Sequence, residues 1–229
     1  MGRDRAPLTA LDVESRALSA VLRQTDPKEF GRPTNCPPWN LAELVVHIAM
    51  SIHLGGADEF PAAAADTGVL TAADYYRRPE RNTADYRQSN VDRTTETAND
   101  VLATTSAARW FDEVSQDTVQ RLSRLDLGRS VHIRSHGPMK LADWVVTRVM
   151  SVAAHGLDVA LTLGLEPWTS KPALGVTCPV LISLLGAEPP AELGWDRLTL
   201  LAAGTGRRRL SSRESAVLGS RQDRFPLLS

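Results

Sequence analysis

The sequence predicts a mainly α-helical fold, a four-helix bundle followed by a small C-terminal α+β domain. Two observations support this prediction. Apolar residues recur at helical spacing in four stretches, and the pattern changes after Trp168, where shorter apolar segments alternate with turns. We therefore expect the bundle to cover residues 1–168 and the second domain to cover residues 169–229.

Helix-stopping and helix-capping residues mark the ends of the first two predicted helices. Asp26 and Pro27 stop the first helix, and prolines keep residues 30–39 out of helix. Asn40 is placed to cap the second helix, and Glu43, three residues later, completes a capping-box pattern.

The third helix is less clearly bounded. Residues 57–90 are interpreted as a long connection with short helical turns, and residues 92–125 predict a helix that is broken near residues 104–106. Residues 130–134 alternate in polarity and predict a short extended segment. His136 follows in the loop that leads into the fourth helix, where it would reach the mouth of a bundle pocket.

The fourth helix is the clearest element, from residues 140 to 163, with Gly164 as its C-terminal stop. Beyond it, residues 176–185 are apolar and fit a helix or a strand. Residues 197–202 resemble a strand, and residues 212–218 predict a short helix.

Composition excludes several classes of protein. Lys and Arg total 26 against 27 Asp and Glu, and this net charge of −1 lacks the basic excess of nucleic-acid binders. No apolar run reaches the roughly 20 residues of a membrane span, and no signal peptide pattern is present. With two cysteines, Cys36 and Cys178, the chain is not a disulfide scaffold. We expect a cytoplasmic monomer or homodimer with small-molecule partners, and neither a nucleic acid nor a membrane as partner.

The C-terminal end is locally basic. Residues 197–229 hold seven arginines against Glu214 and Asp223. The run at residues 207–209 has two interpretations, an anion-attracting surface or a solvated turn.

Polar residues of the fourth helix recur at steps of three and four and therefore share one face. Their types do not resemble the Lys and Glu mixture of a solvated face, which favours the lining of a pocket inside the bundle. They are Trp144, Arg148, Ser151, His155, Asp158 and Thr162.

Two histidines on different helices suggest a metal site. Alone, His47 would be interpreted as a core residue, but bundle cores build metal sites from inward side chains on facing helices, and His155 is such a partner. Imidazole suits zinc, iron, nickel or copper, and a third ligand is not obvious. Cys36 lies before the second helix without a His or Asp beside it in sequence, so an inert thiol is favoured over a nucleophile. Cys178 is expected in the core.

Two segments resemble the signatures of the DinB-like, mycothiol-dependent maleylpyruvate isomerase family. Residues 34–47, TNCPPWNLAELVVH, resemble its T-x-C/T-P-x-W-x-x-x-x-L-x-x-H pattern. Residues 147–158, TRVMSVAAHGLD, resemble its T-R-x-x-E-x-x-x-H-x-x-D pattern, and the ending RFPLLS is similar to that of many actinobacterial members.

The resemblance implies a DinB-like four-helix bundle with a small C-terminal domain. It also implies a divalent metal, usually zinc, held by His, Glu and His, with mycothiol bound there as thiolate. His47 and His155 take the histidine positions, but Ser151 stands at the glutamate position. Either Asp158 is the third ligand or supports His155, or the metal is weakly held or absent.

The resulting hypothesis is an enzyme that uses mycothiol on a small electrophilic metabolite, by thiol S-transfer or by thiol exchange of the kind found in secondary-metabolite biosynthesis. His155 and His47 would be metal ligands or, without metal, bases. Arg148 would hold a ligand carboxylate. The other expected substrate-binding residues are Trp39, Ser151 and Asp158. The alternatives are a mycothiol-dependent isomerase of the maleylpyruvate type and a metal-free, non-catalytic protein that binds thiol conjugates.

Overall fold

The computed structural model describes residues 5–55, 60–63, 68–133 and 137–228. His136, expected near a pocket mouth, lies outside the described residues. Within them the chain is mainly helical with one two-stranded sheet, which confirms the predicted mainly-α class.

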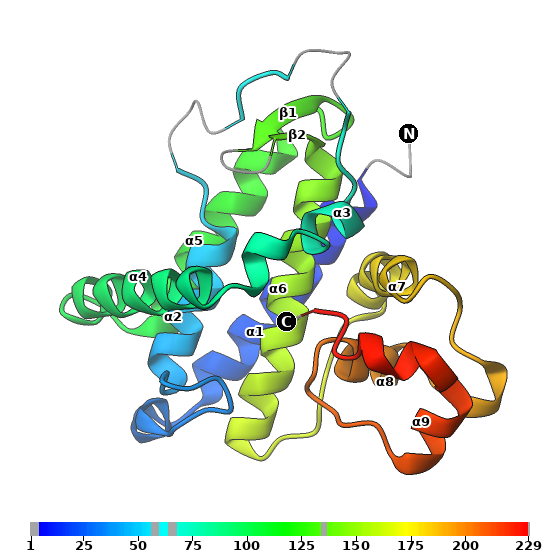
Figure 1. Ribbon diagram of the computed structural model, residues 1–229. Helices are drawn as coiled ribbons and strands as arrows, with labels where there is room; N and C mark the ends of the chain where they lie inside the picture. Colours follow the sequence, from blue (N-terminus) through cyan, green and yellow to red (C-terminus); the bar gives the residue numbers. More distant parts are fainter. Residues whose placement is uncertain (1–4, 56–59, 64–67, 134–136, 229) are drawn as a thin grey trace.

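Four long helices form the bundle (Figure 1). Helix α1 packs against α5 and α6, and α2 packs against α5, α6 and α4. Leu11, Leu44, Phe111 and Val149 contribute fully buried side chains to one shared core. The bundle helices are α1 (Ala6–Gln24), α2 (Leu41–Ile52), α5 (Ala107–Ser123) and α6 (Leu141–Leu163).

The ends of α2 and α6 follow the sequence signals. The Asn40 side chain accepts a hydrogen bond from the backbone N–H of Glu43 at 3.0 Å, and the Glu43 carboxylate accepts from the N–H of Asn40 at 2.9 Å. This confirms the predicted capping box. Gly164 ends α6 with φ of +67°, a conformation that glycine adopts without steric cost.

The connection between α2 and α5 contains more helix than expected. A 3₁₀ helix (Pro27–Gly31) precedes α2, and α3 (Ala72–Tyr76), a 3₁₀ helix (Pro79–Asn82) and α4 (Ala84–Leu102) follow it. The predicted break near residues 104–106 is confirmed, but α4 begins earlier than residue 92.

The only sheet among the described residues precedes α6. Strand β1 (Ser130–Ile133) pairs antiparallel with β2 (Gly137–Lys140), with Ser130 opposite Lys140. The predicted extended segment at residues 130–134 is therefore observed.

The predicted strand at residues 197–202 is wrong, because these residues form helix α8 (Arg197–Gly204). The Asp196 side chain caps this helix by accepting from the N–H of Thr199 at 2.7 Å. The described residues after 168 contain helices and no strand: α7 (Lys171–Leu185), a 3₁₀ helix (Ala191–Leu193), α8, α9 (Ser212–Leu218) and a 3₁₀ helix (Gly219–Arg224).

The C-terminal segment packs against the bundle. Helix α7 lies against α1 and α6, and the buried carboxylate of Glu14 on α1 accepts the N–H of Ser170 at the start of α7, at 2.8 Å. A second apolar cluster joins Leu157 of α6 to Leu181 of α7 and Leu201 of α8. These contacts place the chain that follows α8 beside the polar face of α6.

Helix α6 is long and apolar enough to cross a membrane by length and composition alone. However, 78% of its most apolar window is buried within the fold. A core helix of a soluble protein has the same character, so α6 gives only weak evidence for a membrane span.

Candidate functional site

The two predicted histidines meet inside the bundle. Trp39, directly before α2, stacks on the ring of His47 with centroids 4.3 Å apart. His155 on α6 meets His47 edge-on, with centroids 5.2 Å apart. The two imidazoles are therefore direct neighbours in the fold.

Burial keeps His47 neutral. Burial, together with smaller electrostatic contributions from His155 and from nearby arginines such as Arg93 and Arg148, lowers the pKa of His47 to about 3. The Nδ1 atom of His47 lies 3.1 Å from Thr94 Oγ1 on α4, a partner that the sequence did not indicate.

His155 is held by Asp158, one turn further along α6. His155 Nδ1 lies 2.8 Å from Asp158 Oδ2, and the Asp158 side chain is fully buried. An ionised carboxylate only accepts hydrogen bonds, so Nδ1 carries the proton and Nε2 keeps a lone pair. This arrangement gives His155 the tautomer of a base.

The ion pair of Asp158 is with Arg207, which follows α8. Arg207 Nη2 donates to Asp158 Oδ2 at 2.6 Å, and Nε donates to Oδ1 at 3.0 Å. The Arg207 side chain is only 21% exposed, so neither interpretation of the 207–209 run, a solvated turn or a free anion-attracting surface, holds for this residue. The next residue, Arg208, pairs with Glu214 at 2.6 Å.

Cys36 and Asn35 complete the surroundings of Asp158. Asn35 Nδ2 donates to Asp158 Oδ1 at 2.8 Å, and Cys36 Sγ lies 3.2 Å from Oδ2. Burial and the charge of Asp158 raise the pKa of Cys36 to about 12, so Cys36 is a protonated thiol. The fold thus supplies the acidic neighbour that is missing beside Cys36 in sequence.

The ionisation of this group follows from its hydrogen bonds. Burial alone would raise the pKa of Asp158, but hydrogen bonds from His155 and Arg207 outweigh it and hold the pKa well below its usual value. Burial lowers the pKa of His155, which the hydrogen bond to Asp158 offsets only in part. Asp158 and Arg207 are therefore the charged pair, and His155 is neutral.

Comparison with known proteins identifies the family. The sequence profile described as Mycothiol maleylpyruvate isomerase N-terminal domain matches residues 11–160. The chain belongs to this family. The matched segment contains His47, His155 and Asp158, whereas Arg207 lies outside it. No curated protein matches the chain at a significant level. No solved structure does so either.

The donor atoms do not fit the three-ligand zinc site that the family resemblance implies. Ser151, at the glutamate position, donates its hydroxyl to Ser51 Oγ at 2.8 Å and offers no carboxylate. Atoms of Cys36, His155 and Asp158 lie within 4.8 Å of one another. However, the thiol is protonated and the carboxylate is already bound by the guanidinium of Arg207.

Arg148 lies beside the histidines and has only neutral partners. It donates to the backbone oxygen of Ser51 at 2.6 Å, to Tyr75 Oη at 2.9 Å and to Thr147 Oγ1 at 3.1 Å. Its guanidinium also lies over the Trp144 ring, 5.1 Å from the centroid. Within the described part of the chain no carboxylate pairs with it. Burial would lower the pKa of Arg148, but the tyrosines raise it, so it stays charged.

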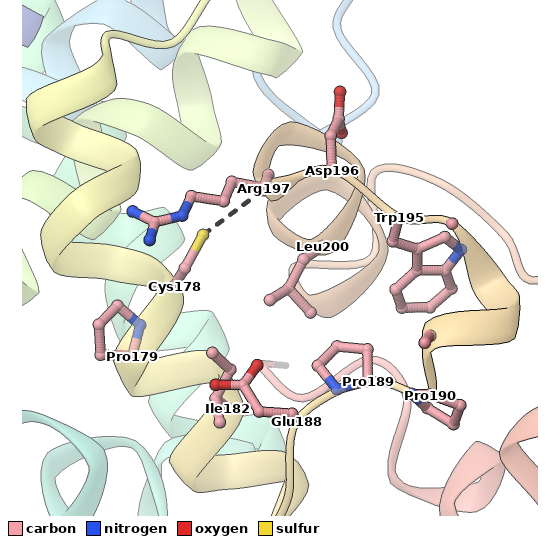
Figure 2. A pocket seen from close by; sticks show the side chains of 12 residues that line it. Cys178, Pro179, Ile182, Glu188, Pro189, Pro190, Trp195, Asp196, Arg197 and Leu200 are labelled. Carbon is pink, nitrogen blue, oxygen red and sulfur yellow. Dashed lines mark hydrogen bonds between the residues drawn. The ribbon is translucent and has the colours of Figure 1, made fainter.

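A pocket elsewhere in the fold lies between α7 and the segment that leads into α8 (Figure 2). Cys178 is buried as predicted, and its Sγ donates to the backbone oxygen of Arg197 at 3.5 Å. Burial raises the pKa of this thiol to about 11. The pocket lining contains no histidine and no paired acid and base, so we place the candidate site at His47 and His155 instead.

The stability of the protein should depend on pH through His47. Its pKa is about 3 when folded and about 6.5 when unfolded, so between these values the unfolded chain binds more protons. The contribution of neutral His47 to the free energy of unfolding is complete above pH 6.5, and it is lost as the pH falls towards 3. Between pH 7 and pH 4.5 we expect His47 to lower the free energy of unfolding by about 2.5 kcal/mol.

Urea unfolding of the native protein and of His47→Gln at both pH values measures this effect. The variant should lose about 2.5 kcal/mol less free energy of unfolding than the native protein between the two pH values. Equal losses in both proteins would contradict the prediction.

Proposed function

We propose that the chain catalyses mycothiol-dependent thiol S-transfer or thiol exchange on a small electrophilic metabolite. Family membership supports the use of mycothiol. The observation that carries the proposal is the His155–Asp158 pair, which leaves a neutral imidazole with a free Nε2 beside a second neutral imidazole. Such a pair is suited to accept the proton of a thiol.

The proposed reaction begins when the thiol proton of mycothiol moves to Nε2 of His155. The thiolate then forms a sulfur–carbon bond at the electrophilic centre, and the leaving group departs with the proton that His155 returns. Asp158 stabilises the imidazolium that exists between these steps. His47 donates or accepts a hydrogen bond at the bound electrophile, and Trp39 excludes water from that side.

Arg148 is proposed to bind a carboxylate of the electrophile. Its charge lacks an acidic partner in the described residues, and it lies next to Ser51 and Ser151. Arg148→Lys keeps the charge but loses the planar fork. We expect this variant to raise KM about 10-fold or more for a carboxylate-bearing electrophile and to leave KM for a neutral one nearly unchanged.

Steady-state kinetics with one electrophile of each kind, matched in reactive group, measures the difference. An equal change for both electrophiles would contradict a carboxylate-binding role.

An isomerase of the maleylpyruvate type is the second candidate, favoured by the description of the family. There the same thiolate would add to the substrate and leave again without net transfer. A non-catalytic protein that binds thiol conjugates is the third. Whichever of the three functions applies, we propose that the protein is cytoplasmic and that its partners are small molecules. We also propose that the bundle domain ends at residue 168 and that the second domain begins at residue 169.

Turnover with mycothiol separates these functions. The purified chain is incubated with mycothiol and either a halogenated electrophile or maleylpyruvate, and products are followed by mass spectrometry. A mycothiol conjugate formed faster than in the absence of protein supports S-transfer. Conversion of maleylpyruvate without conjugate supports the isomerase. Conjugate binding by calorimetry without turnover of either compound supports the binding protein and contradicts our proposal.

A further inference from the structure

The carboxylate of Asp158 has no lone pair left for a metal ion. A carboxylate offers about four acceptor positions. Oδ1 accepts from Asn35 and from Arg207 Nε, and Oδ2 accepts from His155, Arg207 Nη2 and Cys36. Five donors therefore surround two oxygens, and the guanidinium stands where a cation would neutralise the charge.

The hydroxyl at position 151 is engaged as well. Ser151 donates to Ser51 Oγ at 2.8 Å, and Ser51 donates to the backbone oxygen of Ile48 at 2.7 Å. This chain of hydrogen bonds ends on a neutral carbonyl. It therefore brings no negative charge to the histidines.

Apart from Asp158, whose charge is paired with Arg207, the fixed charges that the described residues bring close to the histidine pair are positive. Arg148 approaches from α6 and hydrogen-bonds the backbone of Ser51 on α2, while Arg207 approaches from the segment after α8. Arg93 on α4 adds a third positive charge near His47. A dication placed between the imidazoles would be repelled by Arg148 and Arg93, and the carboxylate that is hydrogen-bonded to His155 is already paired with Arg207.

We propose that this site works without a divalent metal, and that Arg207, from outside the family domain, supplies its fixed positive charge. Arg207 is a positioning residue: it holds Asp158, which in turn holds His155. The inference concerns the same site as the proposed function. Its test measures metal binding rather than turnover, so either can fail without the other.

Zinc binding by the native chain is the first measurement. After incubation with Zn²⁺ and desalting, we expect far less than one zinc per chain by mass spectrometry. Stoichiometric zinc that is lost in both His47→Ala and His155→Ala would overturn the proposal.

Ser151→Glu tests the missing ligand. Restoring a carboxylate at this position should create a His–Glu–His site that holds about one zinc per chain. With Co²⁺ as the probe, the same variant should show the visible absorption of a tetrahedral site, and addition of His155→Ala should abolish it. A folded Ser151→Glu variant that binds no more metal than the native chain would overturn the assignment.

Arg207→Met tests the role of the guanidinium. Arg207 follows α8, so this variant changes a different part of the chain from Ser151→Glu on α6. Removal of the guanidinium frees Asp158 next to Cys36 and His155, so we expect Zn²⁺ to bind more tightly than to the native chain. Arg207→Lys keeps a positive charge and should bind no more zinc than the native chain. If Arg207→Met folds by circular dichroism but gains no affinity, Arg207 does not occupy the place of a cation.

Discussion

Replacement of Asp158 by alanine is expected to lower the free energy of unfolding by about 3–5 kcal/mol. The substitution leaves the guanidinium of Arg207 without a counter-ion in a site where it is only 21% exposed. It also removes the acceptor of His155, Asn35 and Cys36 at once. Breaking a buried pair on one side costs more than the pair contributes, because the remaining charge stays desolvated.

The coupling between Asp158 and Arg207 is measured by a double-mutant cycle. Urea unfolding is followed for the native protein, for Asp158→Ala, for Arg207→Met and for the double variant. Arg207→Met alone is also expected to destabilise, since it leaves a buried carboxylate. The double variant should be more stable than the sum of the two single effects predicts, and strictly additive effects would contradict the coupling. Glu113→Ala is the matched control. Glu113 pairs with Arg109 on the surface of α5, where both side chains are more than half exposed, and its loss should cost less than about 1 kcal/mol.

Replacement of His155 by alanine is expected to lower the rate of the proposed thiol S-transfer about 100-fold to 10,000-fold. The variant loses the only imidazole of the described site whose tautomer is set by a carboxylate. Without that base the thiol of mycothiol stays protonated near neutral pH, and only a small thiolate fraction reacts. Initial rates at saturating mycothiol, measured with the same electrophile for each protein, give the effect.

His53→Ala is the matched control for this experiment. His53 lies exposed at the end of α2, away from the histidine pair, and its loss should leave the rate unchanged. Far-ultraviolet circular dichroism and unfolding midpoints show whether His155→Ala retains the fold. A folded His155→Ala variant with the native rate would show that His155 is not the base.

Local sequence signals predicted those parts of the site that lie on single helices. The capping box of Asn40 and Glu43 fixes where α2 begins and hence where His47 lies on it. The 3.6-residue period places Arg148, His155 and Asp158 on one face of α6. Both predictions concern residues a few positions apart, where backbone geometry alone decides which side chains are neighbours.

The C-terminal segment shows where such signals fail. Residues 197–202 resemble a strand in sequence, but Asp196 caps a helix whose apolar residues pack on α7. A short apolar run fits either structure, and packing decides between them.

The sequence by itself determined the mainly helical bundle, the family, and the two histidines with their acidic neighbour on α6. Only the tertiary structure decided the electrostatics of the site. Arg207 lies 49 residues from Asp158 in the chain and Cys36 lies 122 residues from it, so no local pattern links them. The physical reason is burial: a carboxylate removed from water must be matched by whatever donors the fold brings to it, and here α7 and α8 bring a guanidinium.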